Sequence, residues 1–185
     1  MHASGVIAER DGAVLRHASE EDLPAVDSLT VVCYRPIWES YVAMLGEACY
    51  AAVRHDPELT WEERKIRQNR ELFAEHPEWL WVLADRDGVF GFVSFWLVAE
   101  KSYGHIDNNG VSPERAGHGW ATFMYRHVLQ HFRDVGLRFA HVDTGLDDAH
   151  IPARRAYEAV GFDRAVPTVE YWRDLARPDA ASQPG

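Results

Sequence analysis

The stretch from residue 111 to residue 136 constrains the fold of this chain more than any other part. A strand-like run ends at Val111, Pro113 interrupts it, and a loop containing Gly117 and Gly119 leads directly into an amphipathic segment. Apolar residues in that segment recur at the spacing of one helix face, at Ala121, Met124, Tyr125, Val128, Leu129 and Phe132. Gly136 ends the pattern. The stretch therefore predicts a strand, a glycine-rich turn and a helix in direct succession.

Aromatic and β-branched residues predict three antiparallel strands before this helix. Trp79–Ala84 and Val89–Val98 carry such residues on either side of Asp87-Gly88, a dipeptide typical of tight hairpins. Tyr103–Val111 continues the pattern. Further strands are expected at three other places, namely Ala13–His17, Leu137–Asp143 and Val169–Trp172.

Helix signals fill the gaps between these strands. Ser19 followed by three acidic residues indicates a helix start, and Thr60-Trp61-Glu62-Glu63 is a capping box that opens a helix to about Ala74. A separate short helix is expected from Pro36 to Gly46, and another at Ile151–Val160. The order predicts a mixed α/β (α+β) fold, with a mostly antiparallel central sheet of about six to seven strands, flanking helices and one crossover.

Length and composition indicate one folded unit. With 185 residues and no internal repeat or linker, the chain is expected to form a single domain over residues 1–176. Residues 177–185 contain two prolines and no aromatic residue, so they are expected to be a disordered tail. Hydrophobic residues make up 46% and charged residues 26% of the chain, which is usual for globular proteins and excludes wholesale disorder.

The formal net charge of −10 argues against nucleic acid or an anionic membrane as a partner, because both attract basic patches. It suits a cationic partner such as an amine.

The longest near-apolar run, Val89–Ala99, is shorter than the about 20 residues of a membrane-spanning helix. The chain start shows no apolar leader, and Cys33 and Cys49 lack metal-knuckle spacing. We expect a cytoplasmic protein with reduced cysteines and no metal.

The glycine-rich loop suits a phosphate or pyrophosphate group. N–H groups at a helix start carry partial positive charge, and the small residues Gly117, Gly119 and Ala121 let the backbone approach a ligand closely. A dinucleotide-binding fingerprint would need a third Gly or Ala where Thr122 stands, and a P-loop would need a Lys that the loop lacks. Both nucleotide motifs are excluded, which leaves a plain strand-to-helix turn as the alternative.

Two motifs at the expected separation make the chain resemble the GCN5-related N-acetyltransferases (GNAT). The family's Q/R-x-x-G-x-G/A loop corresponds to Ala116–Ala121, and its Y-E-x-x-G-F motif to Tyr157–Phe162. Ala116 replaces the leading Gln or Arg, with Arg115 one place earlier, and His150 replaces an Asn. The resemblance implies acetyl-CoA or a related acyl-CoA as donor. It also implies direct transfer to a primary amine of a small molecule or peptide in a ternary complex.

The same resemblance implies the contacts with the donor. The pantetheine arm would run along the strand edge at Asn109–Val111, and the pyrophosphate would lie on the loop amides. His118 and Trp120 would flank the phosphates, Trp120 either as a surface lid or as a ligand contact. The expected cofactor-binding residues are Asn109, Val111, Ala116, Gly117, His118, Gly119, Trp120, Ala121 and His150.

Attack of an amine on a thioester needs a base for the ammonium and an acid for the leaving thiolate. The motif match makes Tyr157 the expected acid; a packing role on its helix face is the alternative. Four alternate strand residues would share one face, namely His105, Asp107, Asn109 and Val111. His105 is the preferred base for its ordinary pKa near 6.5, and Asp107 is the competing base. Each could instead be a hydrogen-bonded residue at a cleft rim.

In this family the first helices and the final strands usually frame the acceptor site. Here they supply Tyr34, Trp38 and Tyr41, the expected substrate-binding residues, together with Tyr171 and Trp172. Such aromatic residues suit an amine with an apolar body, although Trp38 and Tyr41 fit a core stripe equally well. Exposed aromatic residues near the chain ends favour a homodimer.

Two further points bear on mechanism. Neither Cys33 nor Cys49 falls in the motif region, which argues against an acyl-enzyme. His127 and His131, four residues apart on the long helix, are expected to be solvated and not metal ligands. The departures at Ala116 and His150 keep a second hypothesis open, a GNAT-fold regulatory or partner-binding domain without activity.

Overall fold

The computed structural model describes residues 5–54 and 58–176. Its strands are β1 (Val6–Arg10), β2 (Ala13–His17), β3 (Leu80–Asp85), β4 (Gly88–Val98), β5 (Tyr103–Val111) and β6 (Phe139–His141). Its helices are α1 (Leu23–Leu45), α2 (Glu47–Arg54), α3 (Trp61–Glu75), α4 (Trp120–Asp134) and α5 (Ile151–Ala159). The expected tail at 177–185 lies outside the described residues. Among the described helices, none combines the length and the apolar character that crossing a membrane requires.

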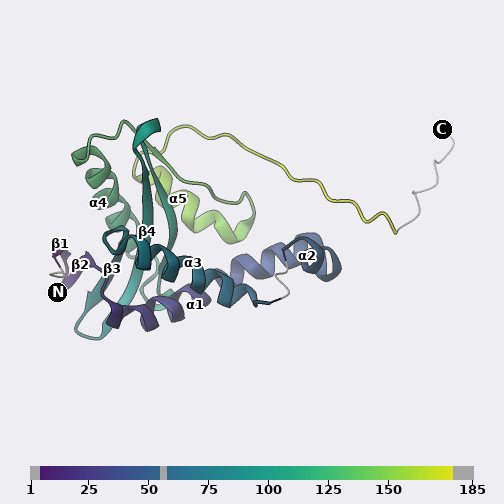
Figure 1. Cartoon of the computed structure of the whole chain (residues 1–185), viewed down its shortest axis with the longest axis horizontal. Helices are drawn as coiled ribbons and strands as arrows, with labels where there is room; N and C mark the ends of the chain where they lie inside the picture. Colours follow the sequence, from purple (N-terminus) through teal and green to yellow (C-terminus); the bar gives the residue numbers. More distant parts are fainter. Residues whose placement is uncertain (1–4, 55–57, 177–185) are drawn as a thin grey trace.

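The six strands form one sheet in sequence order. Figure 1 labels the strands from β1 to β4. Neighbouring strands are antiparallel from β1 to β5, and β6 pairs parallel with β5. Parallel neighbours need a crossover connection, and α4 provides it. The predicted mixed, mostly antiparallel sheet with flanking helices is therefore confirmed.

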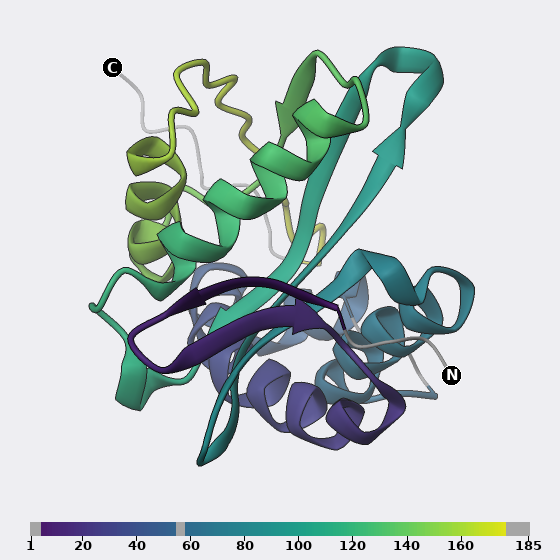
Figure 2. The same ribbon diagram turned by 90° about the vertical axis from the view of Figure 1, so that its left-hand side faces the viewer.

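Helices cover both faces of the sheet (Figure 2). On one face, α4 and α5 pack on a core that includes Val93, Ile106, Met124, Val128 and Phe132. On the other face, α1 and α3 pack on a smaller core formed by Val26, Leu80, Val82 and Phe92. Because β5 contributes side chains to both faces, residues along it can meet groups from either helix layer.

The expected break before Pro36 is wrong. A single helix, α1, runs from Leu23 to Leu45 with Pro36 inside it and ends at Gly46, as the stop signal predicted. Proline removes the N–H that would bond the carbonyl four residues earlier, at Val32. Val32 and Pro36 are both exposed, so water can satisfy that carbonyl and the helix continues.

The C-terminal prediction of a closing strand at Val169–Trp172 is also wrong. Residues 163–174 form no strand and are exposed, and Figure 1 shows this segment leaving the body of the protein as an extended chain. Strand-forming residues need a neighbouring edge to pair with. The adjacent β6 covers only Phe139–His141, shorter than the expected Leu137–Asp143. The sequence analysis also missed β1 and α2.

A β-bulge in β5 changes which side chains share a face. Val93 of β4 pairs with Asn109, whereas Phe95 pairs with Ile106, so β5 carries one extra residue between these pairs. The four residues expected on one face are therefore divided. His105 and Asp107 lie on the face of α1 and α3, while Asn109 and Val111 lie on the face of α4 and α5.

Gly104 gives a direct test of packing between β5 and α4. A Cβ atom built at this position would lie 2.5 Å from the ring of Phe132. We expect Gly104→Ala to lower the free energy of unfolding by about 2 kcal/mol, because overpacking forces the ring or the strand to move. Urea unfolding measures this loss. Adding Phe132→Leu should recover part of it, and additive losses in the double variant would contradict the assigned contact.

Candidate active site

A cleft opens where β5 and β6 separate. The two strands pair only at Tyr103–His105 with Phe139–His141, and β5 then continues to Val111 after β6 has ended. The cleft is lined by parts of α1 and α3, by β5, by the loop before α4, and by the chain from His141 through α5. The unpaired edge of β5 thus faces an open space that could admit an extended ligand.

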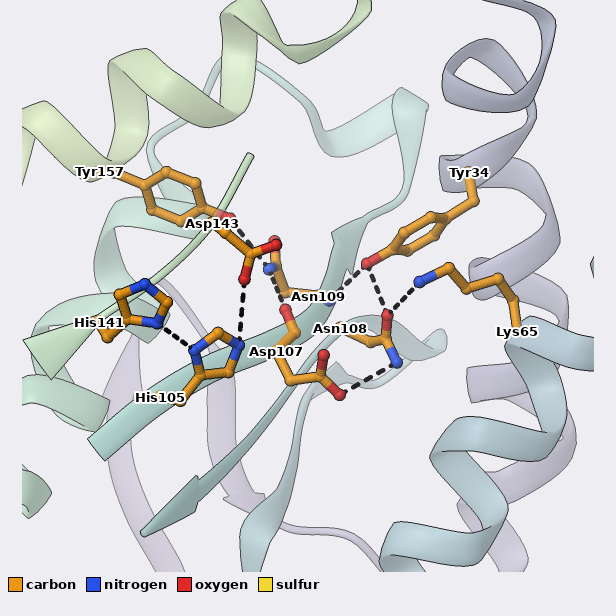
Figure 3. Close-up of polar contacts among 9 residues, drawn as sticks. All are labelled: Tyr34, Lys65, His105, Asp107, Asn108, Asn109, His141, Asp143 and Tyr157. Atoms are coloured by element: carbon orange, nitrogen blue, oxygen red, sulfur yellow. Dashed lines mark hydrogen bonds and ion pairs between the residues drawn. The ribbon is translucent and has the colours of Figure 1, made fainter. Parts of the chain in front are cut away.

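Tyr157 reaches the cleft from α5 and meets Asn109 on β5 (Figure 3). The Asn109 side-chain amide donates to the Tyr157 hydroxyl oxygen at 3.2 Å, and its carbonyl oxygen accepts from the Tyr125 hydroxyl at 2.5 Å. Since the Tyr157 oxygen accepts this bond, its own proton remains available for another acceptor. Burial raises the pKa of Tyr157 and holds the hydroxyl protonated at neutral pH.

Asn108, the next residue on β5, points to the opposite side of the sheet (Figure 3). Its side-chain oxygen accepts from the Tyr34 hydroxyl at 3.1 Å and from the Lys65 ammonium at 2.9 Å. The Tyr34 hydroxyl oxygen also accepts the backbone N–H of Asn109 at 3.3 Å. Burial raises the pKa of Tyr34 and lowers the pKa of Lys65. The sequence analysis missed Asn108 and Lys65, because only the bulge turns Asn108 toward α3.

His105 is buried, with 5% of its surface exposed, and stacks on Trp96 at 4.0 Å between ring centroids. Its Nδ1 lies 2.6 Å from Nδ1 of His141, and its Nε2 lies 3.5 Å from a carboxylate oxygen of Asp143. Burial and the neighbouring His141 lower the pKa of His105 to about 4. The imidazole is therefore neutral at pH 7 and has a charged or polar neighbour at each ring nitrogen.

Asp107 lies within the bulge, half-buried, and accepts a hydrogen bond from the Asn108 amide at 3.2 Å. Burial raises the pKa of its carboxyl group, and the nearby Lys65 opposes this shift. Asp107 lines the cleft, as do Asp143 and Lys65. The structure thus brings both base candidates to the cleft, but it does not place them on the same face as Asn109.

The loop before α4 has the backbone shape that the sequence indicated. Gly117 and Gly119 adopt positive φ angles of 79° and 74°, which glycine tolerates without strain. Gly119 is the N-cap residue of α4 and has no side chain to cap the first N–H groups. These donors at a helix start can receive an anionic group.

Arg10, the last residue of the edge strand β1, contacts this loop and holds it in place. Its guanidinium donates to the carbonyl oxygens of His118 at 2.9 Å and Gly119 at 3.2 Å, and it lies 4.6 Å from the ring centroid of Trp120. The Trp120 ring is buried and contacts Phe90, so the expectation of a surface lid is wrong. No local signal in the sequence links Arg10 to a loop more than a hundred residues away.

The structure shows which contacts Arg115 and His150 make at the two places where the chain departs from the family motifs. Arg115 does not replace the missing Gln or Arg at position 116, since its guanidinium donates to Asp85 at 2.8 Å and lies over Phe90. His150 is buried and its Nδ1 lies 2.5 Å from Asp147, whose other oxygen accepts from the Ser40 hydroxyl. His150 lines the cleft, and its ring is held in place from α1.

The expected acceptor residues lie on α1 but differ in environment. Trp38 stacks on Trp61 at 5.6 Å between ring centroids, and Tyr41 lies edge-on to His150 at 6.2 Å. Tyr34, Trp38 and Tyr41 all line the cleft. Tyr171 and Trp172 also line the cleft, but from the exposed C-terminal segment and not from a closing strand. His127 and His131, both expected to be solvated, are half-buried, and His131 lies against Trp81 and Phe95.

A comparison with protein families decides the classification. The model of the Acetyltransferase (GNAT) family matches residues 38–162, more than half of the chain. The chain belongs to the GNAT family. This match includes β5, the glycine-rich loop, α4 and α5, the elements that build the cleft. The match confirms the resemblance drawn from the two motifs. It also confirms that the protein belongs to a family of acyltransferases.

Individual relatives agree with this assignment. Mycothiol acetyltransferase from Thermomonospora curvata is 33% identical over 128 residues, which cover 57% of this chain and 42% of that protein. The chain thus spans less than half of that relative's length.

Solved structures with little sequence identity show the same fold. A GNAT acetyltransferase from Brucella melitensis in complex with acetyl-CoA has a TM-score of 0.55 at 16% identity. The match covers 90% of this chain and 99% of the Brucella chain. Spermidine N-acetyltransferase from Vibrio cholerae, in complex with CoA and spermine, has a TM-score of 0.58 at 16% identity, with 89% and 88% covered.

Proposed function

We propose that this protein is an N-acetyltransferase that moves the acetyl group of acetyl-CoA to a primary amine of a small molecule or peptide, by direct transfer in a ternary complex. The observation that carries this proposal is the cleft beside β5. It brings Gly117 and Gly119, Tyr157 and Asp107 to one opening. A phosphate-binding loop, a proton donor and a proton acceptor are the groups that the transfer requires.

Acetyl-CoA would follow the edge of β5. Its pyrophosphate would accept from the N–H groups of residues 117–121, and its pantetheine arm would run along Asn109–Val111 toward Tyr157. The separation of β5 from β6 supports this path, because it leaves that strand edge open. Ala116 and Trp120 would contribute backbone contacts, since the Trp120 ring is buried, whereas the exposed His118 would flank the phosphates. His150 would lie beside the arm, held by Asp147.

Tyr157 would protonate the leaving thiolate. Its hydroxyl oxygen already accepts from Asn109, so the hydroxyl proton can be given to sulfur. Asn109 would act as a positioning residue, because its amide bridges Tyr125 and Tyr157. The buried, protonated hydroxyl matches the requirement for a general acid at neutral pH.

Asp107 is our proposed base, ahead of His105. The Asp107 carboxylate is half-buried in the cleft, and a carboxylate can accept more hydrogen bonds than the one it receives from the Asn108 amide. His105 is almost fully buried, and its two ring nitrogens face His141 and Asp143. The carboxylate would receive the ammonium proton before the amine attacks the thioester carbon. This reverses the preference that the sequence suggested.

The acceptor would enter between α1 and the chain around Asp143. Asp107 and Asp143 place negative charge at this end of the cleft, which favours a cationic amine. Tyr34, Trp38 and Tyr41 line the wall on α1 and suit the apolar body of such a molecule. The net charge of −10 is consistent with a cationic acceptor.

Cys33 lies nearer to the cleft than its sequence position suggested, but it is a poor nucleophile. Its thiol donates to the carbonyl oxygen of Val111 at 3.4 Å, and burial raises its pKa to about 11. We expect Cys33→Ala to keep kcat within about threefold of the wild type, because direct transfer forms no thioester on the enzyme. An acetyl-thioester trapped on Cys33, with activity lost in the variant, would contradict direct transfer.

The proposed function is tested by product analysis. The purified protein is incubated with acetyl-CoA and a panel of primary amines that includes polyamines, amino acids and peptides. CoA release that depends on the amine, together with a product one acetyl group heavier, is the expected result. Hydroxyl acceptors and an enzyme-free reaction are the controls.

The alternative, a GNAT domain without activity, is favoured by Ala116 and by Arg115, which is bound to Asp85 instead of the loop. This alternative predicts no amine-dependent CoA release with any member of the panel. Acetyl-CoA would then either fail to bind or bind without turnover.

A further inference from the structure

The parallel pairing of β5 and β6 brings two histidines together. His105 and His141 are register partners in this ladder, so their side chains lie next to each other on the same face. Asp143 follows two residues after His141 and returns to that face. The three side chains come from positions up to 38 residues apart, which is why sequence spacing gave no sign of them.

The donor atoms of these residues lie close together. Each of the three offers one ligand atom, and these atoms all lie within 4.8 Å of one another. Figure 3 shows His105 between His141 and Asp143, with one ring nitrogen directed at each. The stacking on Trp96 fixes the plane of the His105 ring, and Tyr103 lies edge-on to His141. Such supporting contacts orient ligands in protein metal sites.

We propose that His105, His141 and Asp143 form a binding site for a divalent transition cation of the zinc type, at the point where β5 and β6 separate. Two imidazoles and one carboxylate are a common protein contribution to zinc sites that leave the fourth position open. Imidazole ligands favour zinc, nickel, copper and cobalt over magnesium or calcium. The proposal departs from the expectation of no metal and does not depend on the proposed base or acid.

To hold the cation, the two rings must move apart, and the Asp143 carboxylate must rotate from Nε2 of His105, which it faces at 3.5 Å, toward the Nδ1 side. Two nitrogens bound to a tetrahedral zinc at about 2.0–2.1 Å lie about 3.3 Å apart, whereas the two Nδ1 atoms are 2.6 Å apart. A shared proton can hold the rings at this distance, and a cation would replace it. His141 and Asp143 are exposed, so both can rotate and the cation can enter from solvent. A bound cation would link β6 to β5 beside the cleft.

Calorimetric titration with Zn²⁺ tests the site directly, on the full chain without a histidine tag and after treatment with a chelator. We expect one zinc per chain, and a dissociation constant that rises at least about tenfold in His141→Ala and in Asp143→Asn. Both positions are exposed, so these variants should fold normally. His127→Ala, which removes a half-buried histidine on α4, is the matched control and should leave the affinity unchanged.

Cobalt provides a second readout. Absorption bands of four-coordinate Co²⁺ with nitrogen and oxygen ligands are expected in the wild type and in His127→Ala, and are expected to be lost in the two ligand variants. Three results would overturn the site: no zinc binding by the wild type, a dissociation constant within twofold of wild type in either ligand variant, or thiolate-to-cobalt charge-transfer bands that place the metal on a cysteine.

Discussion

Tyr157→Phe should lower kcat by roughly two to three orders of magnitude, the range typical for loss of a general acid. The KM for acetyl-CoA should change little, because the ring and its packing against Tyr125 remain. Asn109 loses one hydrogen bond, which costs about 1 kcal/mol of folding stability. Steady-state kinetics and thermal unfolding together separate the catalytic loss from the structural one.

Tyr125→Phe is the matched control. Tyr125 is also buried, also on a helix, and also bonded to the side chain of Asn109. Its removal should cost similar stability and reduce kcat by less than about tenfold, since it only orients the amide. Equal kinetic losses in the two variants would mean that Tyr157 acts through Asn109. Full activity in Tyr157→Phe would remove the assignment of the acid.

Gly117→Asp should weaken acetyl-CoA binding by on the order of 100-fold, because a carboxylate would face the pyrophosphate. The fold should tolerate it. A Cβ at this position meets no atom within 4 Å, and Asp and Asn are the residues that most readily adopt the positive φ of 79° found there. Calorimetric titration with acetyl-CoA measures the affinity of each variant.

The neutral variant Gly117→Asn separates charge from size. It has nearly the same shape as the aspartate and should weaken binding by only about tenfold or less, from strain and crowding. A pair of variants with equal affinity would show that charge does not matter at this loop. If both bound acetyl-CoA as tightly as the wild type, the pyrophosphate would have to lie elsewhere.

Local signals predicted the elements that hold the site. The capping box at Thr60 forms both of its hydrogen bonds with Glu63, and the glycine-rich turn leads into α4 as its apolar spacing indicated. Tyr157 lines the cleft as the second motif implied. These features depend on residues close in sequence, where side-chain type and spacing fix the backbone directly.

Features that depend on distant partners could not be predicted. Asp107 and Asn109 lie on different faces of the sheet because of a bulge in the pairing of β5 with β4. Arg10 contacts the loop before α4 because of the order of strands in the sheet. The segment Val169–Trp172 has strand-forming residues but does not return to the sheet edge at the short β6. The cluster at His105 exists only because a parallel ladder sets its register with β6.

Thermal unfolding with and without acetyl-CoA tests the central claim most directly, with AMP as the control ligand. At a hundredfold excess over the dissociation constant, a ligand that binds only the native state adds about 2.7 kcal/mol of stability. For a domain of this size that corresponds to a rise in Tm of roughly 5–10 °C. We predict this rise with acetyl-CoA and none with AMP. An unchanged Tm at millimolar acetyl-CoA would contradict the proposed acetyl transfer and favour the domain without activity.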